Sequence, residues 1–198
     1  QEDAGLRQRF GGRFNLVFTG TLTPAQSLDK VLRAVIKARK AGAGTLHLLL
    51  VGDGMSRAGL QALAAELNDA DAVTFYGSVP AQEVPKFTAL ADALLISLAD
   101  TPDLGMTIPG KLASYMAAGK PVVAAMNGAG AEAVQQSGGG LVSAACDEDA
   151  LAENLLSLCA MPLPEREVMG QKAKAYYEKH YRRAELLRRL ETFILQGE

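Results

Sequence analysis

The sequence is poor in the residues that build metal centres and thiol chemistry. It has two cysteines, Cys146 and Cys159, and two histidines, His47 and His180, which lie far apart in the chain. None of these residues has the spacing of a zinc site, and a cysteine–histidine catalytic pair has no basis in the sequence. We therefore expect no bound metal, and cysteines that stay reduced as they do in the cytosol.

Two further absences concern compartment and partners. No apolar run reaches the about 18 residues that a transmembrane helix needs, and the first residues, QEDAGLRQRFGGRF, show no signal-peptide pattern. The net charge is −2, so the chain lacks the basic excess that nucleic-acid-binding proteins carry. These features predict a cytoplasmic protein with no nucleic-acid partner.

What the sequence does contain is a regular alternation of apolar runs and amphipathic segments. The runs are typical of strands in a parallel sheet that is covered on both faces. They are 14–20, 46–52, 72–77, 93–97, 121–126 and 140–144. Helical patterns occupy about 28–41, 57–68, 82–90, 109–118, 130–136, 147–159, 164–178 and 182–195. This alternation predicts an α/β fold, a Rossmann-like doubly wound parallel sheet of about six strands.

Ligands of such sheets bind beyond the carboxyl ends of the strands. The loops at that edge are 19–27, 52–57, 77–80, 98–110 and 127–130. Most of them carry glycine beside the strand or before the next helix, where backbone N–H groups can approach a phosphate, although each glycine alone also suits a tight turn. The G-x-G-x-x-G fingerprint is missing from both FTGTLT and GDGMSR, which disfavours a nicotinamide oxidoreductase.

The stretch IPGKLASYMAAGKPV, residues 108–122, predicts a helix that begins at a possible anion site. Leu112, Tyr115 and Met116 have the spacing of residues that face a core. Lys111 lies near the helix N-terminus, where its charge opposes the helix dipole. A bound anion would explain that position, and an exposed, solvated lysine is the competing interpretation.

Acid–base chemistry is not evident, and we assign no catalytic residue. Asp100 and Asp103 could reach a sugar hydroxyl or simply cap their loop, and Glu132 suits a helix start whatever the function. The last two expected helices alternate lysine and arginine with glutamate, which is typical of a solvated helix. A peripheral contact with a membrane surface stays open.

Five segments, taken in order, resemble the C-terminal, nucleotide-sugar-binding domain of GT-B glycosyltransferases, specifically glycosyltransferase family 4. They are VFTGTLTPAQSLDKVLRAV, LLLVGDGMSRAGLQALA, VTFYGSVPAQEVPKFTALADALLISL, IPGKLASYMAAGKPVVAA and GGGLVSAACDEDALAENLLSL. The AQSLD and IPGKL…YMAAGKPV forms look most like the bacterial branch that transfers amino-sugars in surface-polysaccharide assembly. The resemblance covers nearly the whole chain.

The resemblance implies one of two facing Rossmann-like domains in a retaining transferase that needs no metal or cofactor. Residues 1–13 would be the remnant of an interdomain linker, and residues 14–198 the donor-binding domain with its C-terminal helices. The expected donor is a UDP-sugar, and a missing N-terminal domain would hold an acceptor glycan or lipid-linked glycan, at the inner face of the membrane if the acceptor lies there. The isolated domain is expected to be inactive.

The resemblance also implies where the donor lies. The expected contacts are Gly20, Thr21, Gln26, Met106, Thr107 and Lys111 for the diphosphate, Gly77, Ser78 and Val79 for the base, and Ser114 for the ribose. Many relatives have arginine and lysine where this chain has Thr21 and Gln26, which leaves Lys111 as the leading cation. Two family glutamates fall on Met106 and Ser114, and neither residue is acidic.

Those departures keep two other functions open. One is a degenerate GT-B-like module that serves as a non-catalytic partner or regulatory subunit. The other is a related two-domain enzyme such as a nucleotide-sugar epimerase, which needs acid–base side chains that this chain does not visibly supply.

Overall fold

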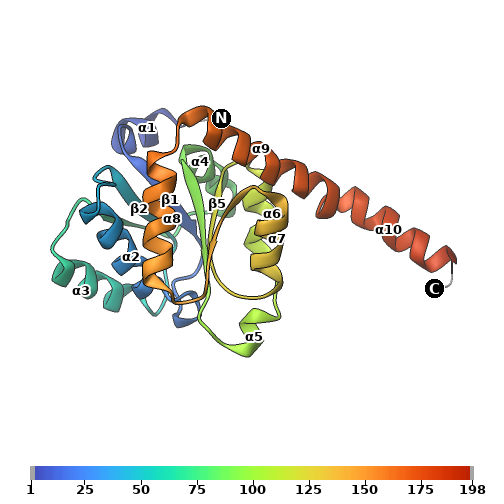
Figure 1. Cartoon of the computed structure of the whole chain (residues 1–198), viewed down its shortest axis with the longest axis horizontal. Helices are drawn as coiled ribbons and strands as arrows, with labels where there is room; N and C mark the ends of the chain where they lie inside the picture. Colours follow the sequence, from blue (N-terminus) through green and yellow to red (C-terminus); the bar gives the residue numbers. More distant parts are fainter. Residues whose placement is uncertain (1–2, 197–198) are drawn as a thin grey trace.

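Six parallel strands form one sheet in the computed structural model, which describes residues 3–196 (Figure 1). They are β1 (Phe14–Thr19), β2 (Leu46–Val51), β3 (Val73–Gly77), β4 (Ala93–Ser97), β5 (Val122–Ala125) and β6 (Gly140–Ser143). Their spatial order is β3-β2-β1-β4-β5-β6. Each strand lies within the apolar run that predicted it, so the doubly wound α/β prediction is confirmed. The order reverses between β1 and β4, and ligands of such sheets bind outside that point.

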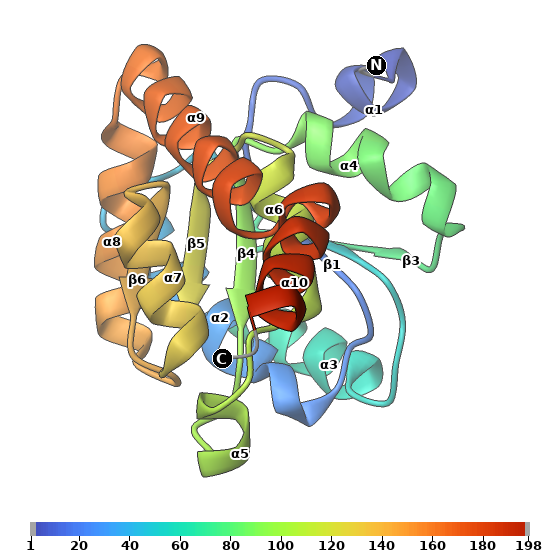
Figure 2. The ribbon, with the colours of Figure 1, turned by 90° about the vertical axis from the view of Figure 1, so that its right-hand side faces the viewer.

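Helices cover both faces of the sheet (Figure 2). One face packs against α2 (Leu28–Lys40), α3 (Arg57–Leu67) and α8 (Glu148–Ala160). The other packs against α1 (Ala4–Phe10), α4 (Val84–Leu90), α6 (Gly110–Ala117), α7 (Ala129–Ser137) and α9 (Leu163–His180). Short turns of helix fill three loops: η1 (Pro24–Gln26), η2 (Ala81–Glu83) and α5 (Pro102–Gly105).

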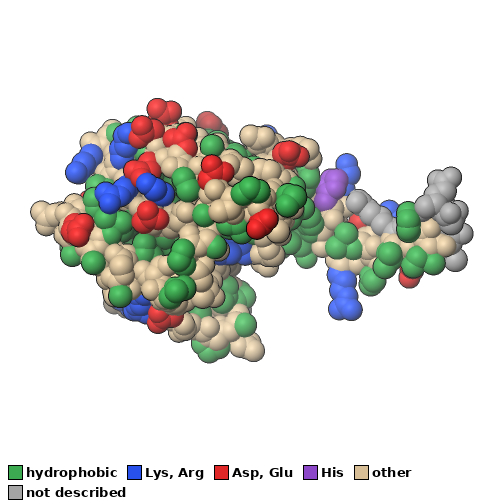
Figure 3. All heavy atoms as spheres, turned by 90° about the horizontal axis from the view of Figure 1, so that it is seen from below, with side chains coloured by type: hydrophobic (Ala, Val, Ile, Leu, Met, Phe, Trp, Pro, Cys, Tyr) green, Lys and Arg blue, Asp and Glu red, His purple; other side chains and the backbone are tan. Residues whose placement is uncertain are grey.

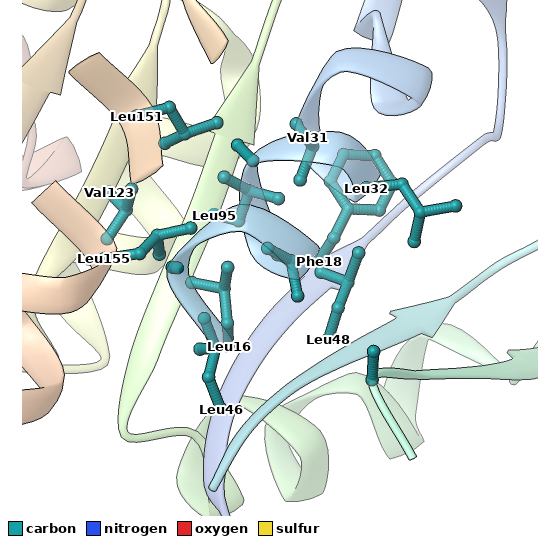
Figure 4. Packing of buried hydrophobic residues seen from close by; sticks show 14 of the residues in the cluster. Leu16, Phe18, Val31, Leu32, Leu46, Leu48, Leu95, Val123, Leu151 and Leu155 are labelled. Atoms are coloured by element: carbon teal, nitrogen blue, oxygen red, sulfur yellow. The ribbon is translucent and has the colours of Figure 1, made fainter. Parts of the chain in front are cut away.

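Side chains of the central strands alternate between two apolar cores. Leu16 and Phe18 of β1 enter the core under α2 and α8, where Leu32 and Leu155 meet them (Figure 4). Val17, between them in the sequence, enters the core on the opposite face. This double burial explains why the strand is apolar at nearly every position rather than at every second one.

The N-terminal helix α1 was not predicted. It lies within the segment 1–13 that we expected to be a linker, of which residues 1–2 fall outside the described part, as do 197–198 at the end of the domain. Asp3 caps the helix by accepting hydrogen bonds from the N–H groups of Gly5 and Leu6. Leu6 and Phe10 are buried in the core beside α4, so this helix is packed onto the domain.

The last helix, α10 (Arg183–Gln196), points away from the rest of the molecule (Figure 1). Hydrophobic side chains lie along this projecting arm (Figure 3). They are Leu186, Leu187, Leu190, Phe193 and Ile194, with exposed fractions of 47–67%. No helix within residues 3–196 combines the length and apolar character needed to cross a membrane.

Candidate functional site

The loops after β1 and β4 meet at the point where the strand order reverses. The Ala99 N–H donates to the Ala25 carbonyl at 2.9 Å and joins the two loops. Helix α6 is fixed to the same place by Tyr115, whose buried hydroxyl accepts a hydrogen bond from the Thr19 N–H at 2.8 Å. Burial raises the pKa of this hydroxyl, so it stays protonated at neutral pH. The start of α6 is thereby held beside the end of β1.

Lys111, in the first turn of α6, lies across the loop that follows β1. Its Nζ is 3.2 Å from Gln26 Oε1 and 3.8 Å from the centroid of the Phe18 ring. Gly20 has a φ of +137°, and a Cβ at this position would lie 3.1 Å from the same nitrogen. Burial lowers the pKa of Lys111 from 10.5 to about 8. The half-buried ammonium has no carboxylate partner among the contacts of the described residues.

A cleft of about 260 Å³ opens beside the loop that follows β1. The loop after β1 contributes Gly20 and Thr21, and the turn after β3 contributes Ser78 and Val79. The Gly52 N–H donates to the Gly77 carbonyl at 2.9 Å, so the turns after β2 and β3 are joined beneath the cleft. The structure thus brings together expected contacts from two loops that are more than fifty residues apart in the sequence.

Sequence analysis missed an ion pair at the rim of the same cleft. Asp53 lines the cleft, and its Oδ2 accepts a hydrogen bond from Arg57 Nη1 at 2.9 Å. Arg57 Nη1 also lies 3.6 Å from where a Cβ of Gly77 would be. The signal in the sequence is the i, i+4 spacing of aspartate and arginine across GDGMSR.

Met106, Thr107 and Ser114 make no side-chain hydrogen bond or ion pair to this group among residues 3–196. Met106 is 77% exposed, and the Thr107 hydroxyl donates to the Leu104 carbonyl at 2.8 Å within its own loop. Ser114 is exposed one turn after Lys111. None of the contacts within residues 3–196 links these three side chains to Gly20 or Lys111, so their role at the site stays a prediction. Asp100 accepts a hydrogen bond from Asn127 at 2.9 Å, as expected of a residue that braces its loop.

The arrangement is suited to binding an anion rather than to acid–base chemistry. The first N–H groups of α6 precede its hydrogen-bonded turns, in which Leu112 donates to Pro109, and such groups attract anions together with the adjacent Lys111. In the described part of the chain, no three His, Cys, Asp or Glu side chains are grouped as metal ligands. Cys146 and Cys159 are free thiols, and burial raises the pKa of Cys159 to about 12.

Comparison with protein families gives a match over most of the chain. A family model described as "Glycosyl transferases group 1" matches residues 13–161. The GDP-mannose-dependent alpha-(1-6)-phosphatidylinositol monomannoside mannosyltransferase of Mycolicibacterium smegmatis is 32% identical over 164 residues, which are 80% of this chain and 42% of that protein. The 2-deoxystreptamine glucosyltransferase of Streptomyces kanamyceticus is 31% identical over 123 residues, 60% of this chain and 30% of that protein.

Solved structures share the fold. HepE from Anabaena, crystallised with UDP, superposes with a TM-score of 0.81 at 19% identity over 98% of this chain and 52% of that one. WaaG, a glycosyltransferase involved in lipopolysaccharide biosynthesis, superposes with a TM-score of 0.73 at 22% identity over 97% of this chain and 50% of that one. The chain spans about two fifths of the length of the mannosyltransferase relative and about half of these structures.

Proposed function

The chain belongs to the group 1 glycosyl transferases, and we propose that it is the donor-binding domain of a retaining transferase that builds a polysaccharide or glycoconjugate. Its relatives are named as mannosyl- and glucosyltransferases, and its fold is that of GT-B enzymes. The donor is a nucleotide-sugar bound without a metal or other cofactor. This function agrees with the order of the five resembling segments along the chain.

Lys111 above the Gly20 loop carries the proposal. An ammonium that is half-buried without a carboxylate partner in the described structure is costly unless an anion binds it in the working protein. The adjacent N–H groups of α6 and the open backbone at Gly20 suit a diphosphate, which would cancel that cost. The nucleoside then extends along the 260 Å³ cleft toward Ser78 and Val79.

The proposed base is uracil, with guanine as the competing choice. Uracil follows from the resemblance to surface-polysaccharide transferases, and HepE binds UDP. Guanine is favoured by the mannosyltransferase relatives, whose names state dependence on GDP-mannose. Ser78 and Val79 line the cleft where the base is proposed to lie, and neither residue favours one base over the other.

Calorimetric titration with UDP, GDP and ADP tests the proposed function. We expect UDP to bind to the wild-type chain and Lys111→Met to weaken binding at least tenfold, because the diphosphate loses its cation. Lys120→Met is the matched control, because Lys120 lies near Asp92 and Arg166 at the amino ends of the strands, away from the cleft. If none of the three nucleotides binds at millimolar concentration, the donor-binding function is wrong.

The acceptor is proposed to bind to a further domain, so that this chain alone binds donor without transferring sugar. We propose that the exposed apolar side chains of α10 pack against that domain. A peripheral membrane contact is the other proposed use of α10, since arginines such as Arg188 accompany its leucines. Cosedimentation of the chain with anionic lipid vesicles, compared with a Leu190→Glu, Phe193→Glu variant, distinguishes the two uses.

The second candidate function is a degenerate module that acts as a partner or regulatory subunit. The observation that favours it is the exposed, non-acidic character of Met106 and Ser114, the two positions where the family resemblance implies glutamate. The titration above also tests this candidate, because a module of this kind would bind none of the nucleotides.

A further inference from the structure

The cleft contains a carboxylate that the proposed function has not used. Asp53 lies two residues after β2, between the loop after β1 and the turn after β3. It lines the cleft together with Gly20, Thr21, Ser78 and Val79. Among the cleft-lining residues it is the one that carries a negative charge.

The carboxylate is held in a fixed position and stays ionised. Oδ1 accepts a hydrogen bond from the Gly54 N–H at 2.8 Å, and Oδ2 accepts one from Arg57 Nη1 at 2.9 Å. The Gly54 bond, helped by Arg57, lowers the pKa of Asp53 below its ordinary value. A carboxylate has about four acceptor positions, so two bonds leave capacity for a ligand. Half of the side chain is exposed for such a contact.

The strand order shows which part of a nucleotide would meet Asp53. The diphosphate is proposed to lie at the end of β1, by Gly20 and Lys111, and the base at the end of β3, by Ser78 and Val79. Strand β2 separates these two strands in the sheet. Neighbouring strands are about 4.8 Å apart, so the ligand crosses about 10 Å from β1 to β3, and the ribose, which joins its two ends, passes over the end of β2.

Ser114 is less well placed for that contact. Helix α6 begins at the carboxyl edge of the sheet and runs away from it, so Ser114 lies about 4.5 Å further along the axis than Lys111. Its hydroxyl also gives at most a neutral hydrogen bond, whereas a carboxylate can accept both hydrogens of a vicinal diol.

We propose that Asp53 binds the ribose hydroxyls of the donor nucleotide and that Arg57 is the residue that positions it. This inference rests on the proposed function, because it presumes a nucleoside diphosphate in the cleft. The ribose 2′ and 3′ hydroxyls donate hydrogen bonds, and the carboxylate oxygens of Asp53 accept them.

The test compares UDP with 2′,3′-dideoxy-UDP in calorimetric titrations of the wild-type chain and of Asp53→Asn. A hydrogen bond to a charged acceptor predicts that the wild type prefers UDP by about tenfold to a hundredfold. In Asp53→Asn the preference falls to about threefold or less, since the amide keeps one acceptor and loses the charge. Asp71→Asn is the matched control, because Asp71 also pairs with an arginine, Arg13, but lies ahead of β3 at the opposite edge of the sheet.

The outcomes separate this inference from the function on which it rests. If the wild type binds both nucleotides equally, or if Asp53→Asn weakens both by the same factor, Asp53 does not bind the ribose, although the chain still binds nucleotides. If the wild type binds neither, the donor-binding function fails and the inference with it. Arg57→Gln serves as the second variant should Asp53→Asn not fold, and it is expected to keep a preference for UDP that is smaller than the wild type's.

Discussion

Replacing Lys111 with methionine should make the free protein more stable while it weakens nucleotide binding. Methionine is close to lysine in length and can pack on Phe18, but it brings no charge into the half-buried site. The lysine has no carboxylate partner among the described contacts, and its ammonium is held by the Gln26 amide and the Phe18 ring. Without a bound anion, the half-buried charge of Lys111 therefore lowers the stability of the folded protein.

The pKa of Lys111 sets the size of the effect. A pKa of about 8 instead of 10.5 corresponds to about 3 kcal/mol of cost for the buried charged form, at about 1.4 kcal/mol for each pKa unit. The face of the Phe18 ring returns about 0.5–2 kcal/mol. We expect Lys111→Met to raise the free energy of unfolding at pH 7 by about 1–2 kcal/mol. For a chain of this size, each kcal/mol raises Tm by about 2–4 °C.

The pH dependence of this gain follows from the same pKa. Below pH 8 the lysine is protonated in both the folded and the unfolded chain, so the full cost is present. Between pH 8 and 10.5 the folded chain releases the proton first, and the cost disappears as the pH rises. The stability advantage of Lys111→Met should therefore be largest at pH 7 and shrink toward pH 10.

Urea unfolding at pH 7 and pH 9.5, followed by circular dichroism, measures both effects. Lys120→Met should leave the free energy of unfolding nearly unchanged at both pH values, as expected for a lysine outside the site. If Lys111→Met is less stable than the wild type at pH 7, then Gln26 and Phe18 already satisfy the ammonium. The argument that the site awaits an anion would then be refuted.

Three further predictions concern protons and the ribose. Binding of UDP at pH 8.5 should take up a fraction of a proton, because the diphosphate raises the pKa of Lys111 above its value of about 8 in the nucleotide-free protein. Calorimetry in buffers of different ionisation enthalpy measures this uptake, and zero uptake would contradict a contact between Lys111 and the diphosphate. Burial lowers the pKa of His47 to about 4, so the unfolded chain takes up the proton first as the pH falls from 6.5. The wild type should lose about 3 kcal/mol of stability between pH 6.5 and pH 4 relative to His47→Gln, and equal losses in urea unfolding would contradict this. Ser114→Glu should tighten UDP binding if Ser114 lies at the ribose; unchanged or weaker binding would instead favour Asp53 as the ribose contact.

The sheet could be predicted from the sequence because its signal is local. Strands such as β1 and β2 are apolar at nearly every position, and helices such as α2 follow at a regular interval. Helix α5 was missed because its 4 residues are too few for a helical period to show, and the 7-residue helix α1 was missed because residues 1–13 were interpreted as a linker. Helix α1 is held by the burial of Leu6 and Phe10, a tertiary effect that the pattern of a short segment does not reveal.

The site was only half predictable for a related reason. Lys111 could be identified because a lysine in the first turn of a helix contradicts the helix dipole, which is a local conflict visible in the sequence. The Asp53–Arg57 pair contradicts nothing locally, because an aspartate after a strand and an arginine four residues later are ordinary. Its position at the cleft depends on β2 lying between β1 and β3, and that order appears only in the folded sheet.

Weak donor binding follows from the charges at this site. A nucleoside diphosphate brings at least two negative charges. Among the described side chains, Lys111 is the one cation in contact with the Gly20 loop, where Thr21 and Gln26 are neutral. Asp53 adds a negative charge on the ribose side, which is tolerable only because Arg57 neutralises it. At a partly exposed site the lysine provides about 1.5–3 kcal/mol, and the helix N-terminus provides about 0.3–2 kcal/mol. We therefore expect UDP to bind this chain weakly, with a Kd of about 1 mM. Tighter binding would require a further cation, such as one from the domain that is proposed to bind the acceptor.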